Sequence, residues 1–181
     1  IMVEESSGER TVLWSRHPGL KLKPEDVSSE VISSGRILLV DCHETAAATR
    51  AARCAKECGI PTVSDIEHVR PGIEDLLKQI DIIITAQDFP SRFTGNADLG
   101  AALKEIQETY RPALVCTTLG KDGSLARTSS GEIRTKGFRV SVEDTTGAGD
   151  VFRGGFIAGW LLRGNSASFD EVLRYANATA A

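Results

Sequence analysis

Apolar runs of strand length alternate with helical patterns through the middle of this 181-residue chain. The expected strands cover residues 35–41, 61–65, 80–85 and 113–118, and the segments between them repeat apolar residues at helical spacing. Strands that are joined through helices need crossover connections, so we expect a mostly parallel sheet with helices on both faces. The pattern therefore predicts an α/β fold.

Shorter strands follow the fourth parallel strand. Residues 124–128 and 132–136 flank a Ser-Ser-Gly turn and predict a hairpin, and residues 139–142 predict one more short strand. Two helices are expected to finish the chain, one from about residue 147 to 162 and one from about residue 169. The chain therefore changes from alternating strands and helices to a hairpin that two helices follow.

The first of these two helices carries Gly154, Gly155 and Gly159 among large apolar residues. Each glycine in a helix costs about 1 kcal/mol relative to alanine, so this cluster indicates that another part of the molecule packs very close to the helix. Close packing of the helix on the sheet is the favoured interpretation, and direct contact with a ligand is the alternative.

The amino-terminal residues have a different pattern. Residues 2–4 and 11–14 are β-like and flank a turn-rich connector, which predicts a two-stranded ribbon. A ribbon of this size is barely stable alone, so we expect it to lean on another part of the protein. We therefore divide the chain into a ribbon, residues 1–18, and an α/β domain, residues 19–181.

The composition excludes several classes of protein. The chain has 21 basic and 25 acidic side chains, a net charge of −4, and no basic block, which argues against non-specific binding of nucleic acid. Its apolar runs are far shorter than the roughly 18 residues of a membrane span. Four cysteines in apolar or helical stretches, with no visible secretory signal, predict reduced thiols and a cytoplasmic location. Residue 1 is isoleucine, so we expect the sequence to be part of a longer chain.

The segment Asp144-Thr-Thr-Gly-Ala-Gly-Asp150 leads into a strongly apolar helix. Gly147 and Gly149 leave backbone N–H groups uncovered where the helix begins, so several donors and the positive end of the helix dipole converge on one point. Asp150 lies in the first turn, within reach of whatever occupies that point. The segment therefore predicts a phosphate-binding turn with a carboxylate beside it. An ordinary glycine turn with an aspartate in a favourable first-turn position is the alternative.

This combination suits phosphoryl transfer to an alcohol. Backbone donors would hold the charge that develops on the γ-phosphate, while the carboxylate takes the hydroxyl proton. The sequence contains no GxxxxGK[ST] segment, so a P-loop is excluded. Gly147-x-Gly149 continues to Phe152, where a dinucleotide-binding turn has its third glycine, so a dehydrogenase is a weaker alternative.

A second glycine cluster, Thr118-Leu-Gly-Lys-Asp-Gly123, comes directly after the fourth strand. Ligands of open parallel sheets collect beyond the carboxyl ends of the strands, so Gly120 and Gly123 would let the backbone approach a nucleotide. An ordinary turn at the end of a strand is the alternative.

Together, the Asp144–Asp150 segment with Val151-Phe152 and the upstream Thr-Leu-Gly-x-x-Gly segment resemble the ribokinase-like (PfkB) carbohydrate kinase family. The resemblance runs through nearly the whole sequence, and residues 10–95 are most similar to ketohexokinase-like members. It implies a Rossmann-like, mostly parallel sheet flanked by helices, with residues 1–14 forming part of a small β lid over the sugar. It also implies that the amino-terminal part and the carboxyl-terminal end of the family lie outside this sequence.

The resemblance also implies roles for individual residues. Asp150 would be the catalytic base. The other implied residues are Gly147, Ala148 and Gly149 for the anion hole around the transferred phosphoryl group, Thr118, Gly120, Gly123 and Asn177 for the ATP site, and Asp144 and Thr146 for a K⁺ site. Many members also have an Asn-x-x-Glu motif that organises Mg²⁺. Ala86 and Phe89 stand in its place here, and ketohexokinase-like members also lack it.

The resemblance implies an ATP-dependent kinase that phosphorylates a hydroxyl group of a sugar or sugar-like small molecule, with Mg²⁺ held mainly through ATP phosphates and water. The expected partner is a small-molecule substrate, with no nucleic acid and no membrane. A nucleoside or other alcohol kinase of the same fold is one alternative, and a catalytically silent nucleotide-binding regulator is another. Exposed ribbon edges invite pairing, which favours a homodimer through the lid.

Overall fold

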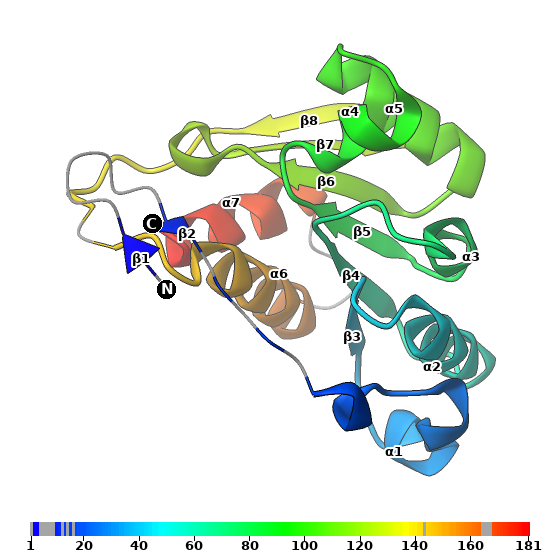
Figure 1. Ribbon diagram of the computed structural model, residues 1–181. Coiled ribbons are helices and arrows are strands. Elements are labelled where there is room, and N and C mark those ends of the chain that lie inside the picture. The colour runs from blue at the N-terminus through cyan, green and yellow to red at the C-terminus, as the bar shows by residue number, and fades with distance from the viewer. Residues whose placement is uncertain are drawn as a thin grey trace.

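A six-stranded sheet forms the centre of the computed structural model, which describes residues 2–3, 10–11, 13, 15, 17–142, 144–163 and 168–181. The strands follow chain order across the sheet (Figure 1): β3 (Leu38–Asp41), β4 (Thr62–Ile66), β5 (Ile82–Thr85), β6 (Leu114–Thr118), β7 (Ser124–Thr128) and β8 (Gly131–Thr135). Neighbours from β3 to β6 are parallel, whereas β7 is antiparallel to both β6 and β8. The predicted α/β fold, with its mostly parallel sheet and its hairpin, is confirmed.

Helices connect these strands and cover both faces of the sheet. They are α1 (Ser29–Ser33), α2 (Thr45–Glu57), α3 (Ile73–Leu77), α4 (Phe89–Thr94), α5 (Leu99–Tyr110), α6 (Ala148–Arg163) and α7 (Phe169–Thr179). Short 3₁₀ turns lie at Pro18–Leu20, Pro24–Asp26 and Gly120–Asp122. Figure 1 shows α6 and α7 on one side of the sheet and α2, α3 and α5 on the other.

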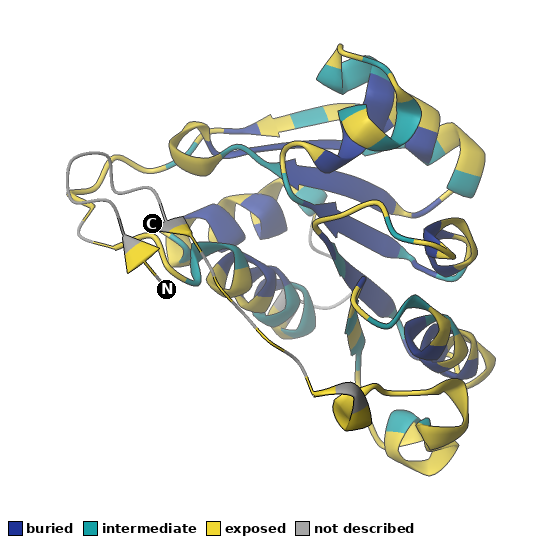
Figure 2. Ribbon diagram, in the orientation of Figure 1, coloured by how far each residue is buried: buried dark blue, intermediate teal, exposed yellow. Residues whose placement is uncertain are grey.

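Each face of the sheet has its own apolar core, because successive residues of a strand point to opposite faces. Ile83 of β5 packs with Leu76 of α3 and Leu103 of α5 in one core. The next residue, Ile84, packs with Phe156 of α6 in the other core. Figure 2 shows that the central strands are almost wholly buried, which accounts for the apolar run of residues 82–84 in β5.

Two of the glycines of α6, Gly155 and Gly159, face α7. Cβ atoms built on Gly155 and Gly159 would lie against residues of α7, whereas one built on Gly154 would meet open space. Close packing is therefore confirmed as the reason for two of the three glycines. The expectation that the sheet is the close neighbour was wrong, because the second carboxyl-terminal helix takes that place.

Two expected strands differ from the structure. Residues 139–142 form no strand, and Val140 and Val142 are exposed, since no strand among the described residues pairs with this segment. The ribbon is present as β1 (Met2–Val3) and β2 (Arg10–Thr11), which are antiparallel and lie apart from the sheet (Figure 1). Its second strand includes Arg10, one residue before the predicted start, and the predicted strand residues 12 and 14 lie outside the described part of the chain. The division of the chain at residue 18 stays a prediction.

None of the helices in the described part of the chain is both long and apolar enough to cross a membrane.

Candidate functional site

The turn before α6 has the conformation that an anion-binding site needs. Gly147 has a φ of 78°, in the left-handed region that glycine adopts readily. Its carbonyl accepts a hydrogen bond from the amide of Val151 at 2.9 Å, which starts the helix. The amides of Gly149 and Asp150 lie in the first turn, where a helix offers N–H groups no carbonyl of its own. Partial positive charge is therefore directed at the space before α6.

Asp150 stands at this same end of α6 with 81% of its side chain exposed. Its carboxylate oxygen Oδ1 lies 3.6 Å from Nη1 of Arg153, one helical turn further along. A carboxylate beside the backbone N–H groups at the start of a helix can accept a proton from a substrate hydroxyl group that approaches this helix end from solvent. Asp150 therefore has the exposure that a general base requires.

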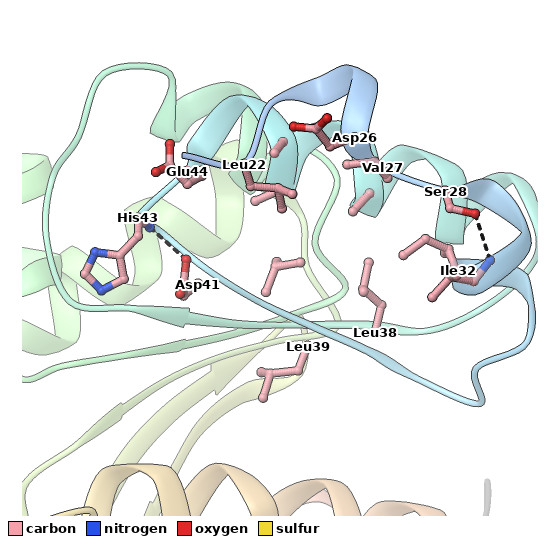
Figure 3. A pocket seen from close by; sticks show the side chains of 15 residues that line it. Leu22, Asp26, Val27, Ser28, Ile32, Leu38, Leu39, Asp41, His43 and Glu44 are labelled. Atoms are coloured by element: carbon pink, nitrogen blue, oxygen red, sulfur yellow. Dashed lines mark hydrogen bonds between the residues drawn. The ribbon is translucent and has the colours of Figure 1, made fainter. Parts of the chain in front are cut away.

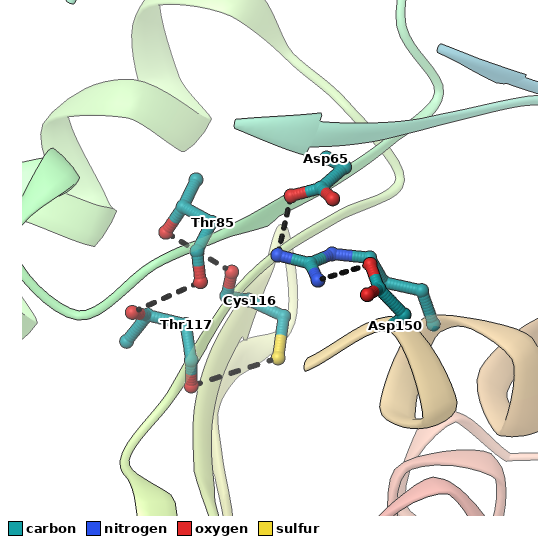
Figure 4. A network of polar contacts seen from close by, with 6 residues as sticks. Asp65, Thr85, Cys116, Thr117 and Asp150 are labelled. Carbon is teal, nitrogen blue, oxygen red and sulfur yellow. Dashed lines mark hydrogen bonds and ion pairs between the residues drawn. The ribbon is translucent and has the colours of Figure 1, made fainter. Parts of the chain in front are cut away.

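Arg153 connects Asp150 to the sheet. Its side chain is 5% exposed, and Nη2 forms an ion pair with Oδ1 of Asp65 on β4. Figure 4 shows Asp65 and Asp150 joined by dashed lines to the same guanidinium group. The sequence analysis did not single out this pair. The three-residue spacing from Asp150 to Arg153 would have placed both side chains on one helix face, but nothing local identifies Asp65 as the partner.

Burial raises the pKa of the Asp65 carboxyl to about 6. Arg153 opposes this effect, and the carboxylates of Glu67, Asp150 and Asp41 add to it. Asp41 lies opposite Asp65 in the β3–β4 register, so both side chains point to the α6 side of the sheet. This end of the sheet is therefore rich in negative charge, and Arg153 is the cation that offsets it at Asp65.

Asp144 and Thr146, the predicted K⁺ residues, form a local turn. Asp144 Oδ1 accepts a hydrogen bond from the Thr146 amide at 2.7 Å, and both residues are exposed. Oxygen donors of this kind suit a hard cation. Among the described residues, no three or more His, Cys, Asp or Glu side chains are grouped to hold a metal ion.

The residues predicted to line the ATP site at the end of β6 differ in their exposure to solvent. Thr118 ends β6, and Gly120 is exposed with open space around the position of a Cβ atom. Gly123 is buried, has a φ of 94°, and lies directly against the backbone of Thr135 and Gly137. The chain itself therefore explains the glycine at position 123, whereas Gly120 faces outward.

Asn177 of α7 is buried, and its side chain is hydrogen-bonded to the sheet. Its Nδ2 donates to Ser124 Oγ at 3.1 Å and to Thr135 Oγ1 at 2.9 Å, and the two hydroxyl groups lie 2.6 Å apart. Both amide hydrogens are therefore used within the protein. Only the side-chain oxygen is left to face another group.

The counterpart of the Asn-x-x-Glu motif offers no carboxylate. Phe89 is 1% exposed and stacks on Phe93, with 5.2 Å between the ring centroids. Asp88, beside it, is exposed and paired with Arg92 at 3.1 Å.

The cysteines take no part in the site. All four are free thiols, as expected. Burial raises the pKa of the Cys116 thiol to about 12, so it stays protonated at neutral pH. In Figure 4 it lies beneath the Arg153 network, next to the hydrogen-bonded pair Thr85 and Thr117.

A separate hollow of about 620 Å³ lies between edge strand β3, α1 and the start of α2 (Figure 3). Its lining is mostly apolar and includes Leu22, Val31 and Leu38. Asp41 and His43 mark its polar end, where Asp41 Oδ1 accepts a hydrogen bond from the His43 amide at 2.8 Å. None of the predicted site residues lines this hollow.

A family model and several known proteins match nearly the whole of this chain. The model of the pfkB family of carbohydrate kinases matches residues 1–181. An ATP-dependent ribose-1-phosphate kinase from Halopiger xanaduensis is 29% identical over 187 residues, covering 99% of this chain and 59% of that protein. An aminoimidazole riboside kinase from Salmonella typhimurium is 31% identical, covering 97% of this chain and 60% of that protein.

Solved structures share the fold. A ribokinase from Thermotoga maritima superposes with a TM-score of 0.79 at 23% identity, covering 99% of this chain and 60% of that one. An adenosine kinase from Sinorhizobium meliloti gives a TM-score of 0.75 at 23% identity, covering 88% of this chain and 52% of that one. The chain thus spans little more than half the length of these relatives.

Proposed function

Because the chain belongs to the pfkB family of carbohydrate kinases, we propose that the protein carrying it transfers the γ-phosphoryl group of ATP to a hydroxyl group of a sugar or sugar-like compound. One observation supports this most directly. The exposed Asp150 carboxylate lies in the first turn of α6, immediately after the left-handed turn at Gly147. An anion receptor and a proton acceptor therefore occupy the same helix end.

In the proposed reaction, Asp150 accepts the proton of the substrate hydroxyl group while the oxygen of that hydroxyl group attacks the γ-phosphorus of ATP. The bond from that phosphorus to the bridging oxygen of ADP then breaks. The amides of Gly147, Ala148 and Gly149 donate to the oxygens of the transferred group, where negative charge develops. The start of α6 fixes the amides of Gly147 and Gly149, so these two need no rearrangement. The Ala148 amide donates to the Thr145 carbonyl at 3.2 Å, so it would have to share that hydrogen bond with the phosphoryl oxygen.

Thr118, Gly120, Gly123 and Asn177 are proposed to line the ATP site, where the carboxyl end of β6 meets the amino end of β7. Gly120 fits a direct contact best, since it is exposed and open. Gly123 would act indirectly, by letting the backbone fold against Thr135. Asn177 would present its side-chain oxygen, since its amide nitrogen is hydrogen-bonded inside the protein.

The proposed cations are Mg²⁺, held mainly by the phosphates of ATP and by water, and K⁺. When bound, they would neutralise phosphate charge. Asp144 and Thr146 supply oxygen atoms of the kind that K⁺ accepts, and their turn directly precedes the glycines of the anion site. The carboxylate of Asp144 is exposed, so a cation can reach it.

The ribbon of β1 and β2 is proposed to form part of a lid over the substrate. Among the described residues each strand pairs only with the other, which leaves outer edges that could pair with a second copy, so the lid is also the proposed site of a homodimer contact. The free cysteines agree with a proposed location in the reducing cytoplasm.

A nucleoside kinase is the second candidate. The similarity to an aminoimidazole riboside kinase, which extends over 97% of this chain, favours it. Both candidates use the same turn and the same base, and they differ only in the substrate.

The test is ADP production by the complete gene product with ATP, Mg²⁺ and K⁺, in the presence of ribose, fructose, ribose 1-phosphate, adenosine or aminoimidazole riboside. We expect one of these compounds to stimulate ADP production strongly. The identity of that compound decides between a sugar and a nucleoside. ATP binding without stimulation by any alcohol would instead identify a silent nucleotide-binding regulator.

A further inference from the structure

The guanidinium group of Arg153 is shared unequally between two carboxylates. Asp65 makes the close contact, whereas Asp150 lies 3.6 Å away. The environments differ as well, because the Asp65 side chain is 17% exposed and that of Asp150 is 81% exposed. The buried acid on the sheet therefore holds the arginine, and the exposed acid on the helix is left facing solvent.

The Arg153 side chain is buried between Asp65 and the glycine turn, which sets its distances to the two carboxylates. Its side chain is 5% exposed, and its Nε has no hydrogen-bond partner among the described residues. A Cβ atom built on Gly149 would lie 2.7 Å from its Nη1, so the guanidinium group passes directly beneath the glycine turn. A small displacement toward solvent would bring Arg153 into full contact with Asp150.

We propose that Asp65 is a positioning residue, which holds Arg153 on the sheet and so prevents it from neutralising Asp150. The inference rests on the proposed function, in which Asp150 accepts a proton. A guanidinium group in close contact stabilises an ionised carboxylate and makes it a weaker base. By holding Arg153 in the longer, 3.6 Å contact with Asp150, Asp65 limits this effect on the neighbouring acid.

The charged groups around Asp65 determine which carboxylate Arg153 pairs with when Asp65 loses its charge. Glu67 and Asp41 surround Asp65 together with Asp150, and Arg153 is the cation among these groups. When the charge of Asp65 is removed, Arg153 keeps Asp150 as its paired carboxylate. The ion pair should then move from the sheet to the helix.

The variant Asp65→Asn tests this in the complete gene product. We expect the acidic limb of the kcat–pH profile to move down by about one unit, with a several-fold loss of kcat at neutral pH. Arg153→Gln should move the same limb upward. Asp75→Asn is the matched control, since Asp75 pairs with the exposed Lys78 on α3, and it should leave the profile unchanged.

A double variant separates the proposed route from simple repulsion between carboxylates. If Asp65 acts through Arg153, then Asp65→Asn should shift the limb by less than a third as much when Arg153→Gln is also present. An equal shift in both backgrounds would show direct repulsion and would overturn the inference. Unshifted limbs in both single variants would overturn it too, while sugar-dependent turnover of the unaltered protein would leave the kinase proposal standing.

A second measurement does not depend on turnover. Urea unfolding of the Arg153→Gln and Asp150→Asn variants, singly and together, gives the coupling between these two side chains. We expect this coupling to increase at least twofold when Asp65→Asn is present. Coupling that stays the same or decreases would contradict the inference even if the protein proved to have no kinase activity.

Discussion

Gly155 of α6 lies directly against Ala176 of α7, so closely that a Cβ atom built on the glycine would be 3.1 Å from the Cα of the alanine. The side chain of Thr179 closes the same space at 3.0 Å. The two helices thus meet backbone to backbone, and they cover the α6 face of the sheet together. Because α6 also carries Asp150, the proposed base, this contact holds α6 in place against α7.

Gly155→Val is expected to destabilise the protein by about 1–3 kcal/mol, because the added methyl groups have no room between the helices. Gly154→Ala is the matched control. A Cβ atom there meets open space, so the better helix propensity of alanine should stabilise the protein by up to about 1 kcal/mol. Urea unfolding of both variants measures the difference. Equal effects of the two substitutions would contradict the packing described here.

Asn177→Ala is expected to cost about 1–3 kcal/mol, because the buried hydroxyl groups of Ser124 and Thr135 lose their common donor. Arg174→Ala, an exposed change on the same helix, should have little effect. Chemical denaturation gives both values. If Asn177→Ala weakened ATP binding with no loss of stability, its contact with the nucleotide would be its main role.

The order of strands and helices could be predicted from the sequence, because β5 is a nearly continuous apolar run and α5 has an apolar stripe that includes Leu103 and Ile106. The start of α6 could be predicted as well, since Gly147 and Asp150 are local signals. Residues 139–142 alternate apolar and polar side chains as a strand does, yet no strand in the described part of the chain pairs with them. Alternation alone does not specify a pairing partner.

The Arg153–Asp65 pair could not be predicted for a related reason. The two residues are far apart in the chain, and they meet only because α6 packs on the face of the sheet to which the Asp65 side chain of β4 points. The neighbour of Gly155 was misjudged similarly, since a glycine cluster indicates close packing without naming what packs. Local chemistry is readable from sequence, whereas contacts between distant elements need the fold.

Asp150→Asn is expected to lower turnover by about 10²–10⁴-fold, because the amide cannot accept the hydroxyl proton. ATP affinity should stay near that of the unaltered protein, since the amides of the turn are unchanged. Asp170→Asn is the control, as Asp170 is likewise an exposed acid in the first turn of a helix, α7. Steady-state kinetics and calorimetric ATP titration measure both effects. Near-normal turnover of Asp150→Asn would exclude it as the base.

Asp65 is expected to make stability depend on pH in a direction that is unusual for an acid. Its pKa is raised by burial from the ordinary 3.8 to about 6, so the folded state holds the proton more tightly than the unfolded state. The resulting stabilisation is present below the ordinary value and is lost as the pH rises through about 6. It amounts to at most about 3 kcal/mol, since each pKa unit corresponds to about 1.4 kcal/mol.

The difference in unfolding free energy between the unaltered protein and Asp65→Asn should therefore decrease from about pH 4 to about pH 7. Asp75→Asn provides a control of opposite sign. The hydrogen bond from Lys78 lowers the pKa of Asp75, so its contribution is present above the ordinary value and is lost as the pH falls. Urea unfolding from pH 7 to well below the ordinary value of 3.8 measures both differences, since the Asp65 contribution changes above that value and the Asp75 contribution changes below it. If the Asp65→Asn difference instead increased with pH, Arg153 would outweigh burial, and Asp65 would be an ordinary stabilising ion-pair partner.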